Sequence, residues 1–204
     1  HNKLNNDMAD TSQTIRNFYN KAAGADFSRD FLFRVGIIRT SRMILGEEEL
    51  TYVRTATLPG RNINNVEVKY MGLAFNVPGG VTYPNSGAYS LEFYCDQNSL
   101  IRERLIEESR AQFDDLTSTG SYNTPGPENY IVLYQLDKQL SPVSKYTLYG
   151  ASVRDVGEIS YEIAEGTGNY KTFTATFAYH YFTNEPPPDT SAGVVNQVFP
   201  NLGR

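Results

Sequence analysis

The sequence predicts a mainly β protein, a β-sandwich or partly closed barrel with one α-helix packed against it. Three observations predict this class. The chain is rich in residues that favour strands, including 15 tyrosines and 11 phenylalanines. Apolar and polar residues alternate in several short runs that end at Gly, Pro or Asn turns. Only one segment has helical periodicity. We therefore expect about eight strands and one helix.

The size and charge of the chain restrict its class further. A length of 204 residues fits one domain with a sizeable core. The formal net charge of −5 argues against a protein that grips nucleic acid through its phosphates. Cys95 is the only cysteine, which excludes an intrachain disulfide and favours synthesis in a reducing compartment. No apolar run approaches the roughly 20 residues of a membrane span. We expect a soluble protein made in the cytoplasm, without a signal peptide.

The two ends of the chain differ in composition from its middle. Residues 1–25 form a polar N-terminal arm, in which Ile15, Phe18 and Tyr19 are the first apolar cluster. Residues 26–182 hold the strand patterns and form the β domain. Residues 183–204 form a C-terminal arm that begins with a Pro-rich segment and continues with scattered apolar residues. The apolar part of this arm either docks on a neighbour or folds back on its own domain.

The first strands are predicted from alternation. Between residues 30 and 40, alternate positions are apolar, which predicts a strand with one buried face. A polar turn at 47–49 precedes a strand over 51–58, which stops at Pro59-Gly60. Residues 66–70 and 73–77 alternate in the same way, and Pro78-Gly79-Gly80 has the composition of a hairpin turn. The predicted buried residues of the first strand are Phe31, Phe33, Val35 and Ile37.

The helix is predicted over residues 98–116, after a strand over 89–95. Asn98 is suited to cap its N-terminus. One stripe is apolar at helical spacing, and charged residues cover the opposite side. The helix leads into a long Ser/Thr/Gly/Pro loop at 117–126, and loops of this kind are usually functional or mobile. The predicted apolar stripe consists of Ile101, Leu105, Phe113 and Leu116.

The remaining segments are predicted as four strands. They span 130–136, 146–152, 158–163 and 172–181. The last has the clearest alternation, since Phe173, Ala175 and Phe177 share one face and threonines occupy the other. In the strand at 158–163 the apolar face alternates with Glu158, Ser160 and Glu162.

The residues needed for catalysis are scarce. The only histidines are His1, on the N-terminal arm, and His180, within the threonine face of the last strand. Cys95 lies on an apolar face, where a free cysteine usually acts as a small hydrophobe. With one Cys and two His, no zinc site has a familiar spacing. The acidic runs at 47–49 and 107–108 have the residue type of the carboxylate pair in a glycoside hydrolase, but adjacent acids on a turn or a solvated helix face are usually only solubilising charges. We therefore predict that the chain is not an enzyme and has no catalytic, cofactor-binding or metal-binding residues.

Four segments, read in order, carry a resemblance to a known family. They are 26–35, 54–60, 91–94 with the helix at 98–116, and 146–159 with 173–181. They contain the sequences DFSRDFLFRV, RTATLPG, LEFY and YTLYG, the last followed by VGEI. The series resembles the tail tube protein of contractile-tailed, T4-like bacteriophages, in register over residues 26–182.

The resemblance implies a structural function. Six subunits form a ring whose inner strands close into one larger barrel, and rings stack into a hollow tube. The implied partners are further copies of the chain, the tail sheath protein, the baseplate tube initiator and a tape-measure protein in the lumen. Double-stranded DNA passes through without specific binding during genome ejection. The implied location is the virion, after assembly in the host cytoplasm, with no cofactor and no stable membrane anchoring.

Within such a tube, two sets of residues have expected roles. Polar strand faces line the lumen in a ring, or simply meet water in a lone sandwich. The residues expected to face the lumen are Glu158, Ser160, Glu162, Thr172, Thr174 and Thr176. The irregular parts of the chain are expected to join adjacent rings. Their expected contact residues are Phe18, Tyr19, Tyr122, Pro187, Val195 and Phe199.

Three alternatives stay open from the sequence. A baseplate tube initiator shares the tube fold but usually carries an extra domain, and is present as one ring per particle. The tube of a phage-like secretion apparatus moves effectors instead of DNA. A β-sandwich binding module or hydrolase would be a monomer with a ligand cleft.

Overall fold

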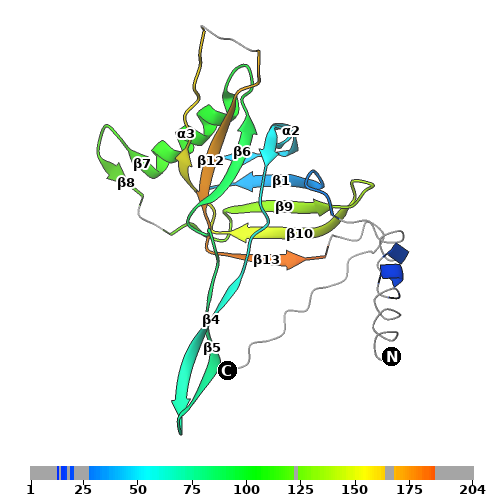
Figure 1. Cartoon of the computed structure of the whole chain (residues 1–204). Coiled ribbons are helices and arrows are strands. Elements are labelled where there is room, and N and C mark those ends of the chain that lie inside the picture. Colours follow the sequence, from blue (N-terminus) through cyan, green and yellow to red (C-terminus); the bar gives the residue numbers. More distant parts are fainter. Residues whose placement is uncertain are drawn as a thin grey trace, which may run out of the picture.

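The computed structural model describes residues 13, 15–17, 19–20, 28–121, 124–163 and 168–186. Two antiparallel sheets pack face to face as a sandwich, and helix α3 (Leu100–Gln112) lies beside strand β11 (Ser152–Val156) (Figure 1). The mainly β class with a packed helix is therefore confirmed. The described residues also include the short helix α2 (Glu47–Leu50) and more strands than the eight that the sequence predicts.

Sheet A has the strand order β13-β10-β9-β1-β2, and sheet B has the order β11-β12-β6-β3. The strands of sheet A are β1 (Phe33–Arg39), β2 (Ile44–Leu45), β9 (Tyr130–Leu136), β10 (Pro142–Tyr149) and β13 (Tyr181–Glu185). Besides β11, sheet B contains β3 (Val53–Thr55), β6 (Tyr89–Tyr94) and β12 (Thr172–Ala178). Two ribbons stand apart from the sandwich: β4 (Asn62–Tyr70) with β5 (Leu73–Thr82), and β7 (Phe113–Asp114) with β8 (Thr119–Gly120).

The strands of the two sheets run across one another, as Figure 1 shows for the horizontal strands of sheet A and the upright strands of sheet B. In such packings, corners form where one stretch of chain leaves one sheet and enters the other. The chain does this directly, without an intervening element, from β10 to β11 at Gly150 and from β12 to β13 at Tyr179 and His180. The single strands predicted at 146–152 and 172–181 are therefore wrong, because each region is divided between two sheets.

The core lies between the sheets and under α3. In β6 and β12 the predicted alternation is confirmed, since Leu91, Phe93, Phe173 and Phe177 are all buried. The rings of Phe93 and Phe173 stack with centroids 5.3 Å apart. Each fully buried side chain of this size contributes about 1.5–3 kcal/mol through removal of apolar surface from water. These paired strands therefore form the centre of the sandwich.

Strand β1 departs from strict alternation. Its register with β9 shifts between Val35 and Ile37, so that Val35 and Ile38 are buried. A bulge of this kind adds one residue and reverses the faces beyond it. Gly36 lies at the bulge, where a Cβ would collide with the ring of Tyr134. The prediction that Ile37 is fully buried is therefore wrong, and Phe31 lies before the strand and is exposed.

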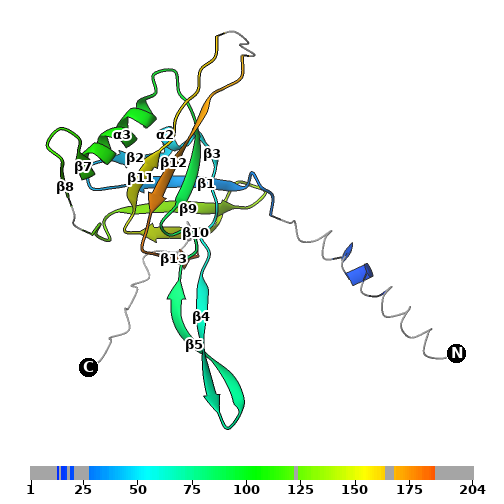
Figure 2. The same ribbon diagram turned by 60° about the vertical axis from the view of Figure 1, so that its left-hand side comes forward.

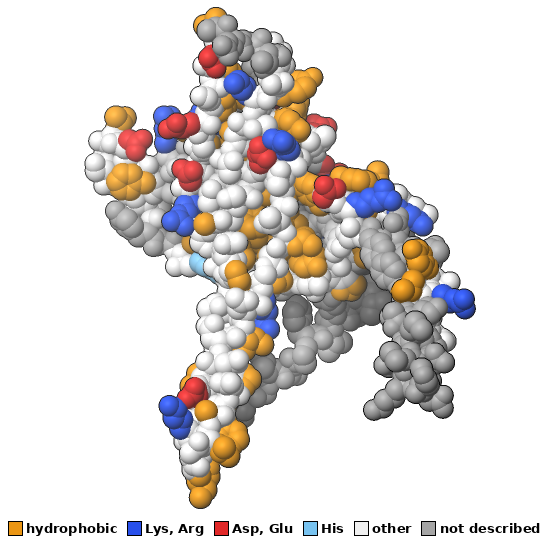
Figure 3. Space-filling model, viewed as in Figure 1, with side chains coloured by type: hydrophobic (Ala, Val, Ile, Leu, Met, Phe, Trp, Pro, Cys, Tyr) orange, Lys and Arg blue, Asp and Glu red, His pale blue; other side chains and the backbone are white. Residues whose placement is uncertain are grey.

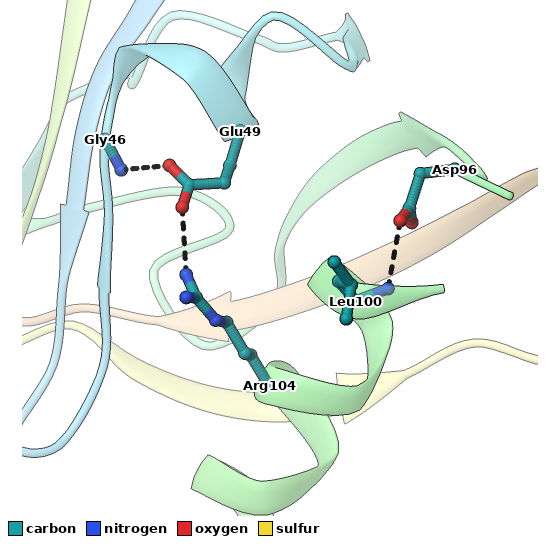
Figure 4. Close-up of polar contacts among 5 residues, drawn as sticks. All are labelled: Gly46, Glu49, Asp96, Leu100 and Arg104. Carbon is teal, nitrogen blue, oxygen red and sulfur yellow. Dashed lines mark hydrogen bonds and ion pairs between the residues drawn. The ribbon is translucent and has the colours of Figure 1, made fainter. Parts of the chain in front are cut away.

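Helices α2 and α3 are linked by one carboxylate (Figure 4). Glu49 accepts a hydrogen bond from the backbone N–H of Gly46 at 3.0 Å and forms an ion pair with Arg104 at 2.9 Å. The predicted polar turn at 47–49 is thus a helical turn that is tied to α3. At the start of α3, the carboxylate of Asp96 accepts a hydrogen bond from the Leu100 N–H at 3.1 Å. Asp96 thereby performs the capping that was predicted for Asn98.

The apolar stripe of α3 is shorter than predicted. Ile101 and Leu105 are buried, as expected. The helix ends at Gln112, and the chain then turns into the β7–β8 ribbon. Phe113 is 46% exposed and Leu116 is 96% exposed, so their predicted burial on the helix stripe is wrong.

Candidate assembly surfaces

The β4–β5 hairpin extends away from the sandwich as a long arm (Figure 2). Every residue of both strands is exposed. The turn consists of Met71 and Gly72, which both have positive φ, as the two central residues of a type I′ hairpin turn require. The turn predicted at Pro78-Gly79-Gly80 is wrong, because these residues lie within β5, near a register shift opposite Ile63 and Asn65.

The register of the hairpin gathers its apolar side chains on one face. Val66 lies opposite Val77, and the next pairs along the same face are also apolar. On the other face, Glu67 lies opposite Asn76 and Lys69 opposite Ala74. Figure 3 shows hydrophobic side chains along the flank and tip of the arm. We call the first set the apolar hairpin face, and its members are Val66, Val68, Tyr70, Leu73, Phe75 and Val77.

The apolar hairpin face has no cover in the part of the chain that the structure describes, since its side chains are 46–67% exposed. The sequence correctly predicts two alternating strands here, but the burial of their apolar face is not found. A two-stranded hairpin is only marginally stable by itself in water. A contiguous exposed apolar surface is typical of protein–protein contacts. This surface therefore has the properties of a docking element.

The outer face of sheet B is polar. Thr172, Thr174 and Thr176 lie on one side of β12, and Thr174 lies directly opposite Glu92 of β6. These three threonines are thus brought together as the sequence predicts. The carboxylate of Glu92 forms an ion pair with Arg54 at 2.9 Å and accepts a hydrogen bond from Thr55 at 3.1 Å. The negative charge of Glu92 on this face is therefore paired with the positive charge of Arg54.

These contacts also affect the protonation of Glu92. Partial burial acts to raise the pKa of its carboxyl. Hydrogen bonds from Thr172 and Thr55, together with the charge of Arg54, outweigh that effect and hold the pKa below its ordinary value. Glu92 was not among the residues that the sequence predicts for this face, although its alternation with Leu91 and Phe93 indicated that it points outward.

The strand predicted at 158–163 is wrong. β11 ends at Val156, and the last sheet contact is the hydrogen bond from the Gly157 N–H to the Thr174 carbonyl at 2.7 Å. The chain then leaves sheet B, and Tyr161 and Ile163 are exposed. Alternation alone does not form a strand where no partner strand is available. No strand therefore aligns Glu158, Ser160 and Glu162 on one face, and their place at the lumen stays a prediction.

Of the residues expected between rings, only one is described. Tyr19 lies in a helical segment and is 67% exposed. Its contact with another ring stays a prediction. The remaining residues lie outside the described ranges: Phe18, Tyr122, Pro187, Val195 and Phe199.

Sheet B has two edge strands, β3 and β11. An edge strand presents unpaired backbone N–H and C=O groups, which can pair with a strand of another chain. β3 is three residues long and β11 is five residues long. These two strands are therefore the edges at which sheet B ends within the described residues.

The sequence matches no protein-family model and no curated protein. Solved structures with the same fold were nevertheless found. A chain of the six-fold symmetrised baseplate of the anti-feeding prophage aligns with a TM-score of 0.52 at 13% identity, over 79% of this chain and 97% of that one. This chain shares the fold of components of contractile injection systems.

Two further structures extend this likeness. A chain of the sheath–tube complex of the extracellular contractile injection system PVC aligns with a TM-score of 0.52 at 9% identity, over 82% of this chain and 97% of that one. A chain of the tube-terminating cap structure of the anti-feeding prophage aligns with a TM-score of 0.50 at 11% identity, over 78% of this chain and 91% of that one. At such low identities the likeness concerns the fold alone.

The side chains that the sequence raises as possible reactive groups make structural contacts where they are described. No three His, Cys, Asp or Glu residues among them are grouped as a metal site would require. Cys95 contacts the hydroxyl of Ser99 at 3.4 Å, and His180 lies against Gly150 at a sheet corner. Glu47 and Glu49 form ion pairs with arginines, as structural charges do. No described helix is long and apolar enough to span a bilayer.

Proposed function

We propose that this chain is a structural subunit of the tube of a contractile injection machine. Copies join side by side into a ring, and rings stack into a hollow tube. The observation that carries the proposal is the exposed apolar hairpin face, on a chain whose fold is that of contractile injection components. A protein that acts alone gains nothing from exposing six apolar side chains on an arm.

Ring formation uses the edges of sheet B. β11 of one copy pairs with β3 of the next, so that the sheets of all copies join into one barrel without open edges. A ring of six copies is supported by the resemblance to phage tail tubes and by the six-fold symmetry of one structural neighbour. In this arrangement every copy makes the same heterologous contact with the next copy, and the series of contacts closes into a ring.

The polar face of sheet B then lines the lumen. Thr172, Thr174 and Thr176 are uncharged, and Glu92 is matched by Arg54. Such a wall offers DNA phosphates neither a cluster of cations that would hold them nor a strong unpaired negative field. We therefore propose a phage tail tube as the finer function, surrounded by a sheath, held by a baseplate initiator and filled by a tape-measure protein until DNA passes. Residues 1–25 and 183–204 act as contacts between rings, outside the β domain at 26–182.

An injection-system tube that carries effector proteins is the second candidate. It is supported by the structural neighbours, which belong to extracellular contractile systems. Isolation of native particles discriminates the two, because a phage tube is attached to a DNA-filled capsid. An initiator of the same fold would be present at a single ring per particle.

The direct test compares two variants that introduce the same charge at adjacent positions of β5. Phe75→Lys changes the apolar hairpin face, and Asn76→Lys changes the polar face. Negative-stain microscopy and light scattering are expected to reveal rings and tubes for the wild-type protein and for Asn76→Lys. Phe75→Lys is expected to form no tubes, with an unchanged circular dichroism spectrum. A wild-type chain that stays a monomer at every concentration would contradict the proposal.

A further inference from the structure

Glu108 breaks the apolar stripe of helix α3. Ile101, Leu105 and Glu108 follow at helical spacing, and all three are buried, Glu108 with only 4% of its surface exposed. Burial of a carboxylate is unfavourable unless it has a partner. The Oε2 atom of Glu108 is nevertheless buried without a hydrogen-bond partner. A charged residue at a core position, against the local pattern, indicates a functional constraint.

Glu108 lines a hollow of about 460 Å³ between α3, the loop after β1 and the loop before β9. Asn129 lines the same hollow, is 3% exposed, and its Oδ1 atom is also buried without a partner. The amide group of Asn129 is held by its donor bond to Ser41 Oγ at 3.1 Å. Its backbone carbonyl accepts hydrogen bonds from Gly150 and Ala151 at 2.8 Å and 3.1 Å. The site is therefore built from anchored acceptors.

The chemistry of the lining selects a cationic donor. Glu128 adds a second carboxylate to the hollow, beside Glu108 and the Asn129 carbonyl oxygen. Arg42 lies at the wall of this hollow and of a neighbouring one of about 600 Å³, but within the described residues it forms no ion pair with Glu108. A guanidinium or ammonium group suits this lining, since it offers several N–H donors and a positive charge to carboxylate and amide oxygens.

The position of the hollow indicates where this cation comes from. Ala151 and Ser152, at the start of edge strand β11, form part of its wall. At the opposite edge of sheet B, a groove of about 470 Å³ beside β3 is lined by Arg34 and Arg54. Arg54 is held by Glu92 at 2.9 Å, whereas Arg34 has a 3.4 Å ion pair with Glu47 between two exposed side chains and lies over the ring of Tyr134, 5.0 Å from its centroid. Exposed ion pairs of this kind are weak, so Arg34 can exchange Glu47 for a more buried carboxylate.

We propose that the Glu108 hollow binds the guanidinium of Arg34 from the neighbouring copy in the ring. This rests on the proposed function, which brings β11 of one copy beside β3 of the next. Each copy then supplies an acceptor hollow at one side and a basic side chain at the other. The site is incomplete in a single chain and is completed by assembly. Its buried charge also favours this register over others, because a misaligned neighbour leaves Glu108 unpaired.

The test is a double-mutant cycle on assembly, measured by sedimentation velocity at low and high salt. Glu108→Gln keeps the shape of the side chain and removes its charge, and Glu103→Gln makes the same change on the exposed face of α3. Glu108→Gln and Arg34→Gln are each expected to weaken assembly about tenfold or more, and the double variant little further. Glu103→Gln is expected to assemble as the wild type does. Monomeric Glu108→Gln is expected to melt at the wild-type temperature or above it.

Several results would overturn the proposal. If Glu108→Gln assembles as well as the wild-type protein does, the hollow has no role in assembly. If the losses of assembly in Glu108→Gln and Arg34→Gln add up in the double variant, the two side chains do not interact and Arg34 is not the source of the cation. A monomer that loses stability in both Arg42→Ala and Glu108→Gln would identify Arg42 of the same chain as the partner. A wild-type protein that never assembles would overturn the proposed function together with this inference, whereas the other results leave the proposed function intact.

Discussion

Gly150 lies directly against the imidazole ring of His180, with no room between them for a Cβ atom. The two residues form the corners at which the chain passes from one sheet to the other. The His180 backbone N–H donates to the Tyr149 carbonyl at 2.8 Å, which joins the two corners side by side. Gly150 also has a φ of +71°, a conformation that glycine adopts without strain. Both constraints exclude a side chain at this position.

Gly150→Ala is therefore expected to lower the free energy of unfolding by roughly 2–4 kcal/mol. Gly72→Ala is the matched control, because Gly72 has a φ of +81° and no atom near its absent Cβ. This control is expected to cost only about 1 kcal/mol, from backbone strain alone. Urea denaturation measures both. Adding His180→Ala to Gly150→Ala should recover part of the loss, and equal losses for the two glycine variants would contradict the crowded corner.

Helix α3 offers a test of where the core ends. Leu105 is fully buried and Leu116 is 96% exposed, although the sequence assigned both to one apolar stripe. Leu105→Ala is expected to destabilise the fold by about 2–5 kcal/mol, because it leaves a cavity. Leu116→Ala is expected to change stability by less than about 0.5 kcal/mol. Thermal denaturation of the two variants discriminates these outcomes, and a large loss for Leu116→Ala would show that this residue packs against another part of the protein.

The lowered pKa of Glu92 predicts a pH dependence of stability. The folded state favours the charged carboxylate, so its contribution is complete above the unfolded pKa of about 4.3. It is lost as the pH falls through the lower pKa of the folded state. Glu92→Gln should therefore reduce stability near neutral pH by up to about 1 kcal/mol, a modest value because Arg54 is half exposed. Below the folded pKa the two proteins should converge. A constant difference at all pH values would contradict this assignment.

The hairpin is expected to contribute to assembly and not to the stability of the sandwich. Asn62 pairs with Thr82 at its base, so a short Gly-Ser link can replace the residues between them. Because both strands are exposed throughout, the shortened protein should keep the melting temperature of the wild-type monomer. It should form no tubes in negative-stain images. A large drop in melting temperature would mean that the hairpin packs on its own sandwich.

Local patterns in the sequence determined the class and the centre of the fold. Alternation identified the inward faces of β6 and β12, and helical spacing identified Ile101 and Leu105 of α3. The outward threonines at 172, 174 and 176 followed from the same alternation. These features are local, because the side-chain period of a strand or helix is a property of the backbone itself. The scarcity of His and Cys was equally visible in the sequence.

Only the tertiary structure decided what each face meets. The apolar residues of β4 and β5 alternate as regularly as those of β6, yet they lie on an exposed arm. The bulge at Gly36, the corner at Gly150 and the missing strand at 158–163 depend on which partner strands are within reach. Glu108 is a charged residue of the kind expected on the solvated face of a helix, and it is nevertheless buried. Periodicity states that one side of an element is apolar, whereas the packing of distant segments decides whether this chain or another one covers it.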